Sequence, residues 1–491
     1  MKKINLVLIG CGRHSKRIYL PLIKKYQKNF RINLKAVIDI DDKKNLVEEY
    51  LNDFKFDCKK LFLKDYKLKN DYTLKKSQIY EINSFIKNMD IDSVIISTDP
   101  NSHKAYSLWA LDNELNILID KPICARNNAS FDIKEAKKIL SDFEEIEELY
   151  YIKKKQKKEL IFSCMAQRRY HPAMIRIKKE IKNGFFATNC PISSITMLHS
   201  DGQWRMPNEI LYEKYHGFNE GIGKCSHSGY HFFDIISWFL DDDLGKNKKY
   251  DQITIFSNFV RPMDFLSQIN YSDYNNLFGE EFRNSHNKKT FDKISNDKRL
   301  GEIDAFINYC FLSKGKKLTS VNLSLVHNGF STRNWFYPKK DLYKGNGRVR
   351  HESYIIEQGP FQSIHYHSYQ SEQILSKKKK KKSIAGDEFH SEVLIFRNSK
   401  FFKNSKSFER IDFGSISPND LKGYSRGHQE EARGNCFVEF FEAIQGIIEP
   451  LEMISTIEKH KRGVSLMSGA YMSACKELEG KNPLIKLEYK K

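Results

Sequence analysis

The sequence lacks the cysteine patterns of disulfide-stapled domains and of structural zinc sites. Its nine cysteines include no Cys-x-x-Cys pair and no repeated spacing, which indicates a reducing compartment. Long apolar runs are missing too. The N-terminal run, Leu6–Ile9, is too short for the core of a signal peptide, and no run reaches membrane-spanning length. We therefore expect a cytoplasmic protein without a membrane partner.

Two motifs of nucleophilic and phosphate-binding sites are also missing. The chain has no Gly-x-Ser-x-Gly elbow. The pair Gly223-Lys224 lacks both the upstream glycine spacing and the following Ser or Thr of a P-loop. We find no internal repeat.

The chain is strongly basic. It has 491 residues, enough for two or three domains, and a formal net charge of +20. A basic surface can bind nucleic acid, and this alternative stays open, as does the attraction of an anionic substrate. The excess is nevertheless spread along the chain, and its only cluster, Lys377–Lys382, is typical of a solvated loop tip. We expect no nucleic-acid partner.

Short apolar runs punctuate the first 122 residues. They are Ile4–Ile9, Asn33–Ile38, Val94–Ile96 and Asn116–Ile119, and helical segments separate them. Buried strands that alternate with helices are the signature of a parallel sheet. Functional residues are expected where these strands end.

A glycine pair ends the first run. Gly10 permits a tight turn, and Gly12 lets the backbone approach a pyrophosphate at the next helix N-terminus. Ser15 stands at the third position of this fingerprint, where Gly or Ala is usual. Asp39 ends the second strand, where a carboxylate accepts hydrogen bonds from an adenosine ribose. No Arg follows Asp39 directly, so the sequence favours NAD over NADP. The alternative is an ordinary α/β turn with a surface Asp.

Further motifs follow in a fixed order. Thr98–His103 reads TDPNSH, Asp120–Pro122 reads DKP, Gln167–Pro172 reads QRRYHP, and Gly221–Asp234 reads GIGKCSHSGYHFFD. In this order they resemble the TPNxxH, EKP, QRRFxP and GGGxLxDxGxHxxD motifs of the glucose–fructose oxidoreductase / inositol dehydrogenase / MocA family. The stretch Phe437–Gly480 resembles the closing helices of that family.

The resemblance implies an α/β protein in two parts. We expect an N-terminal Rossmann dinucleotide-binding domain over residues 1–125. A C-terminal α+β domain with a large, mostly antiparallel open sheet would fill residues 126–491, with an extended region at about 250–425 and C-terminal helices at about 430–480. Loops such as Phe265–Leu300 are expected to be partly disordered. Because such open sheets tend to pair, we expect a homodimer or homotetramer.

The resemblance also implies an NAD site at the strand ends of the first domain. One of the two arginines Arg168 and Arg169 would hold the cofactor or a substrate carboxylate, and the other would be structural. The residues expected to contact NAD are Gly10, Gly12, Arg13, His14, Ser15, Asp39, Thr98, Pro100, Asn101, His103, Asp120, Lys121 and Arg169.

Lys121 is the first predicted catalytic residue. It follows a parallel strand and should face the cleft where ligands collect in this architecture. Burial or a neighbouring cation would lower its pKa toward that of a useful base. The resemblance implies that it contacts both the nicotinamide ribose and a substrate hydroxyl. Asp120 replaces the usual Glu and keeps the charge.

Two histidines complete the predicted catalytic set. The resemblance places His231 at the family's acid/base or substrate-orienting histidine, and His227 where the family usually has Asp. Spaced four apart, they would share a helical face, but no third ligand is evident and Ser228 stands where zincins have Glu. We expect no metal. A satisfied core histidine is the alternative for each.

Four side chains besides Lys121 are expected to contact substrate: Tyr170, Trp204, His227 and His231. Trp204 would stack on a sugar ring, with a core or lid role as the alternative. The predicted function is an NAD-dependent oxidoreductase acting on a sugar, polyol or nucleotide sugar. Two alternatives remain: redox-neutral epimerisation, elimination or glycosidic cleavage with recycled, tightly bound NAD, and a non-catalytic dinucleotide- or sugar-binding protein.

Overall fold

The computed structural model describes residues 1–212, 217–240, 248–327, 331–332, 349–371, 385–386, 390–403, 405–414 and 428–488. The chain divides into two compact units. Unit 1 comprises Met1–Arg126, Ile139–His171 and Asn419–Val464, and unit 2 comprises Asn127–Lys138, Pro172–Pro418 and Ser465–Lys491. Each unit thus draws on three stretches of chain. The lysine run Lys377–Lys382 lies outside the described residues.

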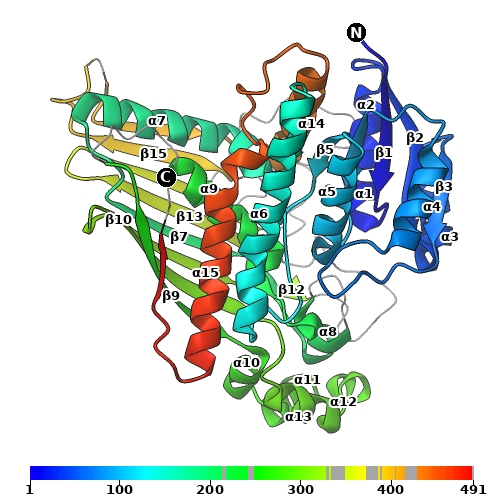
Figure 1. Ribbon diagram of the computed structural model, residues 1–491. Helices are drawn as coiled ribbons and strands as arrows, with labels where there is room; N and C mark the ends of the chain where they lie inside the picture. Colours follow the sequence, from blue (N-terminus) through cyan, green and yellow to red (C-terminus); the bar gives the residue numbers. More distant parts are fainter. Residues whose placement is uncertain are drawn as a thin grey trace, which may run out of the picture. The chain divides into compact units, whose positions relative to one another are not determined.

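A six-stranded parallel sheet forms the centre of unit 1 (Figure 1). Its strand order, β3-β2-β1-β4-β5-β6, is that of a doubly wound dinucleotide-binding fold. Strands β1, β2, β4 and β5 were predicted from the sequence because they are buried apolar runs. The edge strand β3 was not predicted, because its first two residues are exposed lysines. The strands are β1 (Ile4–Ile9), β2 (Ile32–Ile40), β3 (Lys59–Leu63), β4 (Ser93–Ile96), β5 (Asn116–Ile119) and β6 (Phe162–Cys164).

A late helix completes the core of unit 1. Helix α14 (His428–Ile444) packs on α2 (Tyr19–Tyr26) and the turn after it: Phe437 stacks on Tyr26 and Phe441 on Phe30, with ring centroids 6.0 and 6.1 Å apart. The other helices are α1 (Arg13–Arg17), α3 (Lys44–Asp53), α4 (Lys76–Ile86), α5 (His103–Asp112) and α6 (Ile133–Gln156), which begins in unit 2.

Unit 2 is built on a nine-stranded sheet in the order β16-β15-β14-β13-β7-β11-β10-β9-β17. Neighbouring strands are antiparallel except β7 and β11, which run parallel, so the mostly antiparallel sheet is confirmed. The strands are β7 (Ser194–Ser200), β9 (Gln252–Val260), β10 (Asp304–Ser313), β11 (Lys316–Val326), β13 (Val349–Gln358), β14 (Gln362–Ser371), β15 (Glu392–Arg397), β16 (Phe408–Asp412) and β17 (Ile485–Glu488). Two short strands, β8 (Gln203–Trp204) and β12 (Ser331–Thr332), pair separately.

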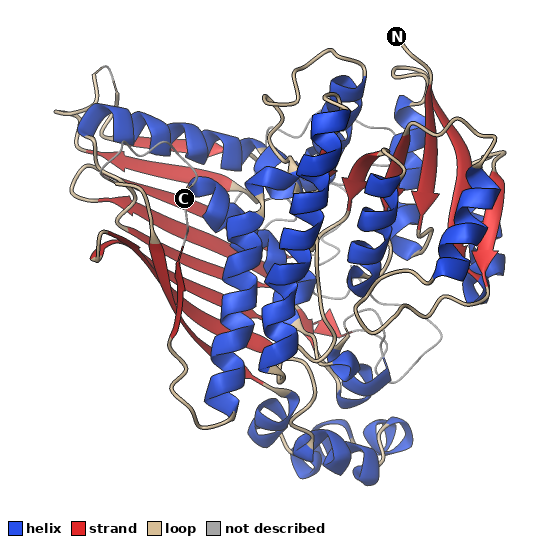
Figure 2. Cartoon of the chain, in the orientation of Figure 1, coloured by secondary structure: helices blue, strands red, loops and turns tan. Residues whose placement is uncertain are grey.

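Helices cover one face of this sheet (Figure 2). They are α7 (Pro172–Thr188), α9 (Tyr230–Phe239) and α15 (Lys461–Leu478). Side chains of the sheet donate to backbone carbonyls of the helices, as Tyr309 Oη does to Leu466 over 3.2 Å and Gln362 Nε2 does to Glu180 over 2.8 Å. None of the described helices is long and apolar enough to cross a membrane.

The expectation that Phe265–Leu300 is partly disordered is wrong. This stretch contains α10 (Pro262–Gln268), α11 (Tyr271–Phe278), α12 (Glu280–Ser285) and α13 (Lys288–Asn296). Asn270 and Asn287 cap α11 and α13 with their side-chain oxygens. Together with α8 (Pro207–Tyr212), these helices bury a separate apolar cluster that includes Tyr274, Phe282 and Ile294. We call α10–α13 the helical insert.

Candidate active-site residues in the two units

The glycine pair of unit 1 lies at the carboxyl end of β1. Gly10 has φ +85°, and a Cβ there would lie 2.5 Å from the Ser97 carbonyl oxygen, so only glycine fits. A Cβ at Gly12 would meet nothing within 4 Å. The backbone at Gly12 is therefore open to the close approach of a ligand.

Ser15 suits the third position of this fingerprint. Its side chain is fully buried, and its hydroxyl donates to the Gly10 carbonyl oxygen over 2.7 Å. It also lies 2.9 Å from the Ser97 hydroxyl, at the end of β4. Serine at this position thus ties the loop to the end of β4.

Asp39 binds the same loop from the end of β2. Its two carboxylate oxygens accept the Cys11 N–H over 2.6 Å and the Ile40 N–H over 2.8 Å. Burial raises the pKa of Asp39. Because a carboxylate oxygen can accept more than one hydrogen bond, ribose hydroxyls can still be bound here.

These features fit NAD. Gly12 is the N-cap of α1 and supplies no side-chain cap, so backbone N–H groups of the first turn are available to a pyrophosphate. Arg13 follows on that turn and is exposed. The open space at Gly12 leaves room for a pyrophosphate, and the Asp39 carboxylate can accept ribose hydroxyls. Contacts of these residues with NAD stay predictions.

A second polar group follows β4 and β5. His103 is fully buried, and its ring nitrogens lie 2.7 Å from the Pro122 carbonyl oxygen and 3.1 Å from that of Thr98. His103 therefore fixes the two strand ends to each other. Pro100 and Asn101, the other predicted contacts of this turn, are half-buried.

Lys121 follows β5 within a charged group. Burial lowers the pKa of Lys121; the Asp120 carboxylate opposes that shift, and Arg433 and Arg17 reinforce it. Asp120 Oδ2 lies 3.1 Å from His14 Nε2. Burial likewise lowers the pKa of His14, to about 4. Arg433 was not predicted from the sequence, because it belongs to α14, far along the chain from Lys121.

Two residues that were predicted to contact ligands, Arg169 and Tyr170, form hydrogen bonds with other residues of unit 1. Arg169 is fully buried and donates to the carbonyl oxygens of Ile454 over 3.0 Å and Lys459 over 2.9 Å. Tyr170 is buried and donates to the Glu439 carboxylate. This geometry favours structural roles for both, and ligand contacts for them stay predictions.

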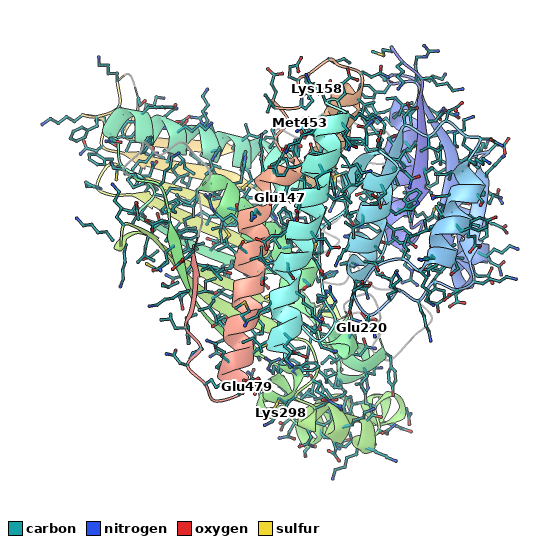
Figure 3. The ribbon with its side chains drawn as sticks, in the orientation of Figure 1. Glu147, Lys158, Glu220, Lys298, Met453 and Glu479 are labelled. Carbon is teal, nitrogen blue, oxygen red and sulfur yellow. The ribbon has the colours of Figure 1, made fainter. Side chains whose placement is uncertain are left out.

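The glycines of the Gly221–Asp234 motif set the chain path in unit 2. Glu220, labelled in Figure 3, ends a 3-10 turn, and Gly221 follows with φ +67°. A Cβ at Gly223 would lie 2.1 Å from the Glu302 carbonyl oxygen. The buried Glu302 carboxylate in turn accepts the Cys225 N–H over 2.8 Å. The motif is thus held against the start of β10.

Both predicted histidines follow on adjoining helical turns. His227 lies in a π-helical turn, Cys225–Gly229, and is half-buried. His231 lies in the first turn of α9 and is buried. Their i, i+4 spacing therefore spans a π-turn rather than a regular α-helix. Among the described residues no group of three or more His, Cys, Asp or Glu side chains could hold a metal ion.

A small pocket, not predicted from the sequence, lies next to His227. Asp201, Arg205, Lys224 and His327 line it together with His227, Phe218, Gly223 and Ile303, all from unit 2. Asp201 Oδ2 lies 3.0 Å from both Lys224 Nζ and Arg205 Nη2. Asp201, Arg205 and His327 lie outside the Gly221–Asp234 motif, so the motif alone does not reveal that they meet Lys224 in one pocket.

Trp204 lies against the helical insert. Its indole N–H donates to the Tyr274 hydroxyl over 3.1 Å, and its ring lies 5.7 Å from that of Phe278. These contacts favour the core or lid role. Stacking of Trp204 on a sugar stays a prediction.

Solved structures share this fold. A levoglucosan dehydrogenase in complex with NADH and levoglucosan is 14% identical, with a TM-score of 0.57 over 100% of each chain. An oxidoreductase from Agrobacterium radiobacter in complex with NAD+, L-tartaric acid and magnesium is 12% identical, with a TM-score of 0.57 over 99% of this chain and 98% of that one. Aldose-aldose oxidoreductase from Caulobacter crescentus is 11% identical, with a TM-score of 0.53 over 99% of this chain and 100% of that one.

Sequence comparison locates the family in the N-terminal part. No curated protein matches the chain. Residues 4–154 match the GFO_IDH_MocA family model, described as an oxidoreductase family with an NAD-binding Rossmann fold. The predicted family, the oxidoreductase class and NAD as the cofactor are thereby confirmed. Residues 4–154 therefore belong to the glucose–fructose oxidoreductase / inositol dehydrogenase / MocA family of NAD-binding oxidoreductases.

Proposed function

We propose that this protein transfers a hydride between NAD and a hydroxyl-bearing carbon of a sugar, polyol or nucleotide sugar. The observation that carries the proposal is Lys121, which follows β5 of the dinucleotide-binding sheet and whose pKa is lowered by burial. The levoglucosan dehydrogenase that shares the fold binds NADH and levoglucosan, which supports a sugar-like substrate. A cytoplasmic location and a homodimer or homotetramer stay predictions.

Lys121 acts as the base in this proposal. Oxidation of an alcohol requires that its hydroxyl proton leave, and Lys121 Nζ accepts that proton. Bound NAD supplies the hydride acceptor. A lowered pKa raises the fraction of neutral amine near neutral pH, which is the form that accepts a proton.

The two histidines of unit 2 assist at the substrate. His231 shares the proton transfer, and His227 positions a substrate hydroxyl through its imidazole. The resembled motif has Asp at this position, whereas His227 offers either a donor or an acceptor, depending on its tautomer.

The test is turnover by the purified full chain. NADH formation would be followed with NAD and a panel of levoglucosan, L-sorbose, myo-inositol and glucose. At least one compound should be oxidised, and Lys121→Met should lower kcat/KM by at least about 100-fold, the usual contribution of a general base. Equal turnover by wild type and Lys121→Met would contradict the role of Lys121.

A further inference from the structure

The pocket beside His227 is built from buried charged side chains. Lys224, Arg205 and Asp201 are 4%, 3% and 6% exposed. Arg205 is held on both sides, because its Nη2 lies 3.0 Å from Asp201 Oδ2 and its Nη1 donates to Glu209 Oε1 over 2.7 Å. Charged groups this deeply buried are costly unless they are paired, so this cluster calls for an explanation.

Lys224 differs from Arg205 in what it binds. Its only contact to a carboxylate among the described residues is the 3.0 Å ion pair with Asp201 Oδ2. In the described part of the chain its Nζ has no partner that satisfies hydrogen-bond geometry, although an ammonium group carries three donors. Lys224 therefore presents unused donors to the pocket it lines.

The size of the pocket limits what it can hold. It has room for about one water molecule, the size of a single hydroxyl group. Its lining adds the imidazoles of His227 and His327. His327 Nδ1 lies 2.7 Å from Asp304 Oδ1.

The charges of the pocket disfavour an anion. Lys224 and Arg205 are matched by the carboxylates of Asp201 and Glu209, and Asp304 adds a further carboxylate beside His327. Among the described residues that line the pocket, neither Lys224 nor Arg205 is left without a carboxylate, so a bound phosphate or carboxylate would be an uncompensated buried charge, which is strongly disfavoured. An uncharged hydroxyl meets no such penalty.

We infer that Lys224 is a substrate-contacting residue, which donates a hydrogen bond to one uncharged hydroxyl group of the substrate in this pocket. The inference rests on the proposed function and deepens it. It makes the substrate a neutral sugar or polyol at this position and excludes a sugar acid or sugar phosphate there. Lys224 belongs to the motif segment Gly221–Asp234, but neither its motif position nor its charge marked it in the sequence.

The experiment compares Lys224→Met with a matched buried lysine. Lys178 of α7 is 8% exposed and donates to the Trp238 carbonyl oxygen, but it does not line the pocket. Kinetic constants for levoglucosan, L-sorbose, myo-inositol, glucose and glucuronate would be measured with the wild type, Lys224→Met and Lys178→Met. The Kd for NAD would be measured for each protein.

Lys224→Met should raise the KM of the neutral substrate at least tenfold, with a smaller change in kcat and an unchanged Kd for NAD. Lys178→Met should leave KM within about twofold. If Lys224→Met does not fold, the double variant Asp201→Asn, Lys224→Met removes both charges of the pair and should show the same rise in KM.

Three results would overturn the inference. They are an unchanged KM in Lys224→Met or in the double variant, a preference of the wild type for glucuronate over glucose, and a failure of the wild type to bind or oxidise any neutral compound of the panel. An unchanged KM with normal turnover would leave the proposed function intact. Loss of NAD binding by the wild type would refute the proposed function itself.

Discussion

At the scale of the residue, Lys121 is a lysine whose surroundings disfavour the charged form of its amine. Burial lowers its pKa below the usual 10.5, and Asp120 only partly compensates. Alcohol oxidation needs the neutral amine, so kcat/KM should rise with pH until it passes the lowered pKa and then level off. The reverse reaction needs the ammonium form and should show the opposite trend.

Lys121→Arg tests this pH dependence. Arginine keeps the positive charge but does not lose its proton in the accessible range. The variant should therefore be slow at every pH and lack the rise. A pH–rate profile of the same shape in Lys121→Arg would show that another group accepts the proton.

Gly10 and Gly12 form a matched pair for a second prediction. Gly10→Ala should destabilise unit 1 by more than 1 kcal/mol, because φ is +85° and the new Cβ would lie 2.5 Å from the Ser97 carbonyl oxygen. Gly12→Ala has free space around the new Cβ, and its cost should stay near that of a weaker N-cap, at most about 1 kcal/mol.

The two variants should separate folding from binding. Gly12→Ala should remain folded yet bind NAD at least tenfold more weakly, because its methyl group occupies the space needed by a pyrophosphate. Thermal melting and NAD titration would measure both effects. Unchanged NAD affinity in Gly12→Ala would contradict the placement of the pyrophosphate.

The positions of Gly10 and Asp39 at strand ends could be predicted from local sequence, and their contacts with NAD stay predictions. Gly10 and Asp39 end neighbouring strands, and their mutual position follows from the parallel sheet. Arg169 and Tyr170 were predicted to contact ligands, because their partners Ile454 and Glu439 lie 285 and 269 residues away in the chain. Long-range partners of this kind cannot be read from one motif.

At the scale of the element, the helical insert shows how caps and a small apolar cluster order a polar stretch. His286 lies within it, 3% exposed and stacked on Phe282 with ring centroids 4.6 Å apart. Burial lowers its pKa to about 4, from 6.5. Between these pH values the unfolded insert binds more protons than the folded one, so stability falls as pH falls through this window.

The predicted effect is acid sensitivity of α10–α13. Hydrogen exchange of this segment, corrected for intrinsic exchange rates, should show weaker protection at pH 5 than at pH 7. The change should be at most about 1.4 kcal/mol per pH unit for one histidine. His286→Gln should flatten this dependence. An equally steep pH dependence in His286→Gln would assign it to another group.

The insert was mispredicted because its signals are short. Each of its helices has nine residues or fewer, and such helices are marginal alone. Their stability comes from the shared cluster around Tyr274 and Phe282, which depends on tertiary packing. The long strands β9 and β11, by contrast, carry a regular alternation of buried and less buried side chains, which is a strong local signal for a strand.

At the scale of the whole molecule, the order of motifs predicted the fold class, and the domain bounds 1–125 and 126–491 stay predictions. Helix α14 packs against α2, near the beginning of the chain, and belongs to unit 1. More than 400 residues nevertheless separate α14 from β1. Composition does not encode this return of the chain. Two patterns do encode the two kinds of sheet: continuous apolar runs such as β4 and β5 form the parallel sheet, and alternating strands such as β9 and β11 form the antiparallel one.

The central claim is that the Gly10, Gly12 and Asp39 site binds NAD for turnover. The most direct measurement is mass spectrometry of small molecules released from gently purified, denatured protein, combined with NAD and NADP titrations of the emptied protein. We predict that NAD binds more tightly than NADP. Stoichiometric, non-exchanging NAD would favour the redox-neutral alternative with a recycled cofactor. If neither dinucleotide binds at millimolar concentration, the account is contradicted.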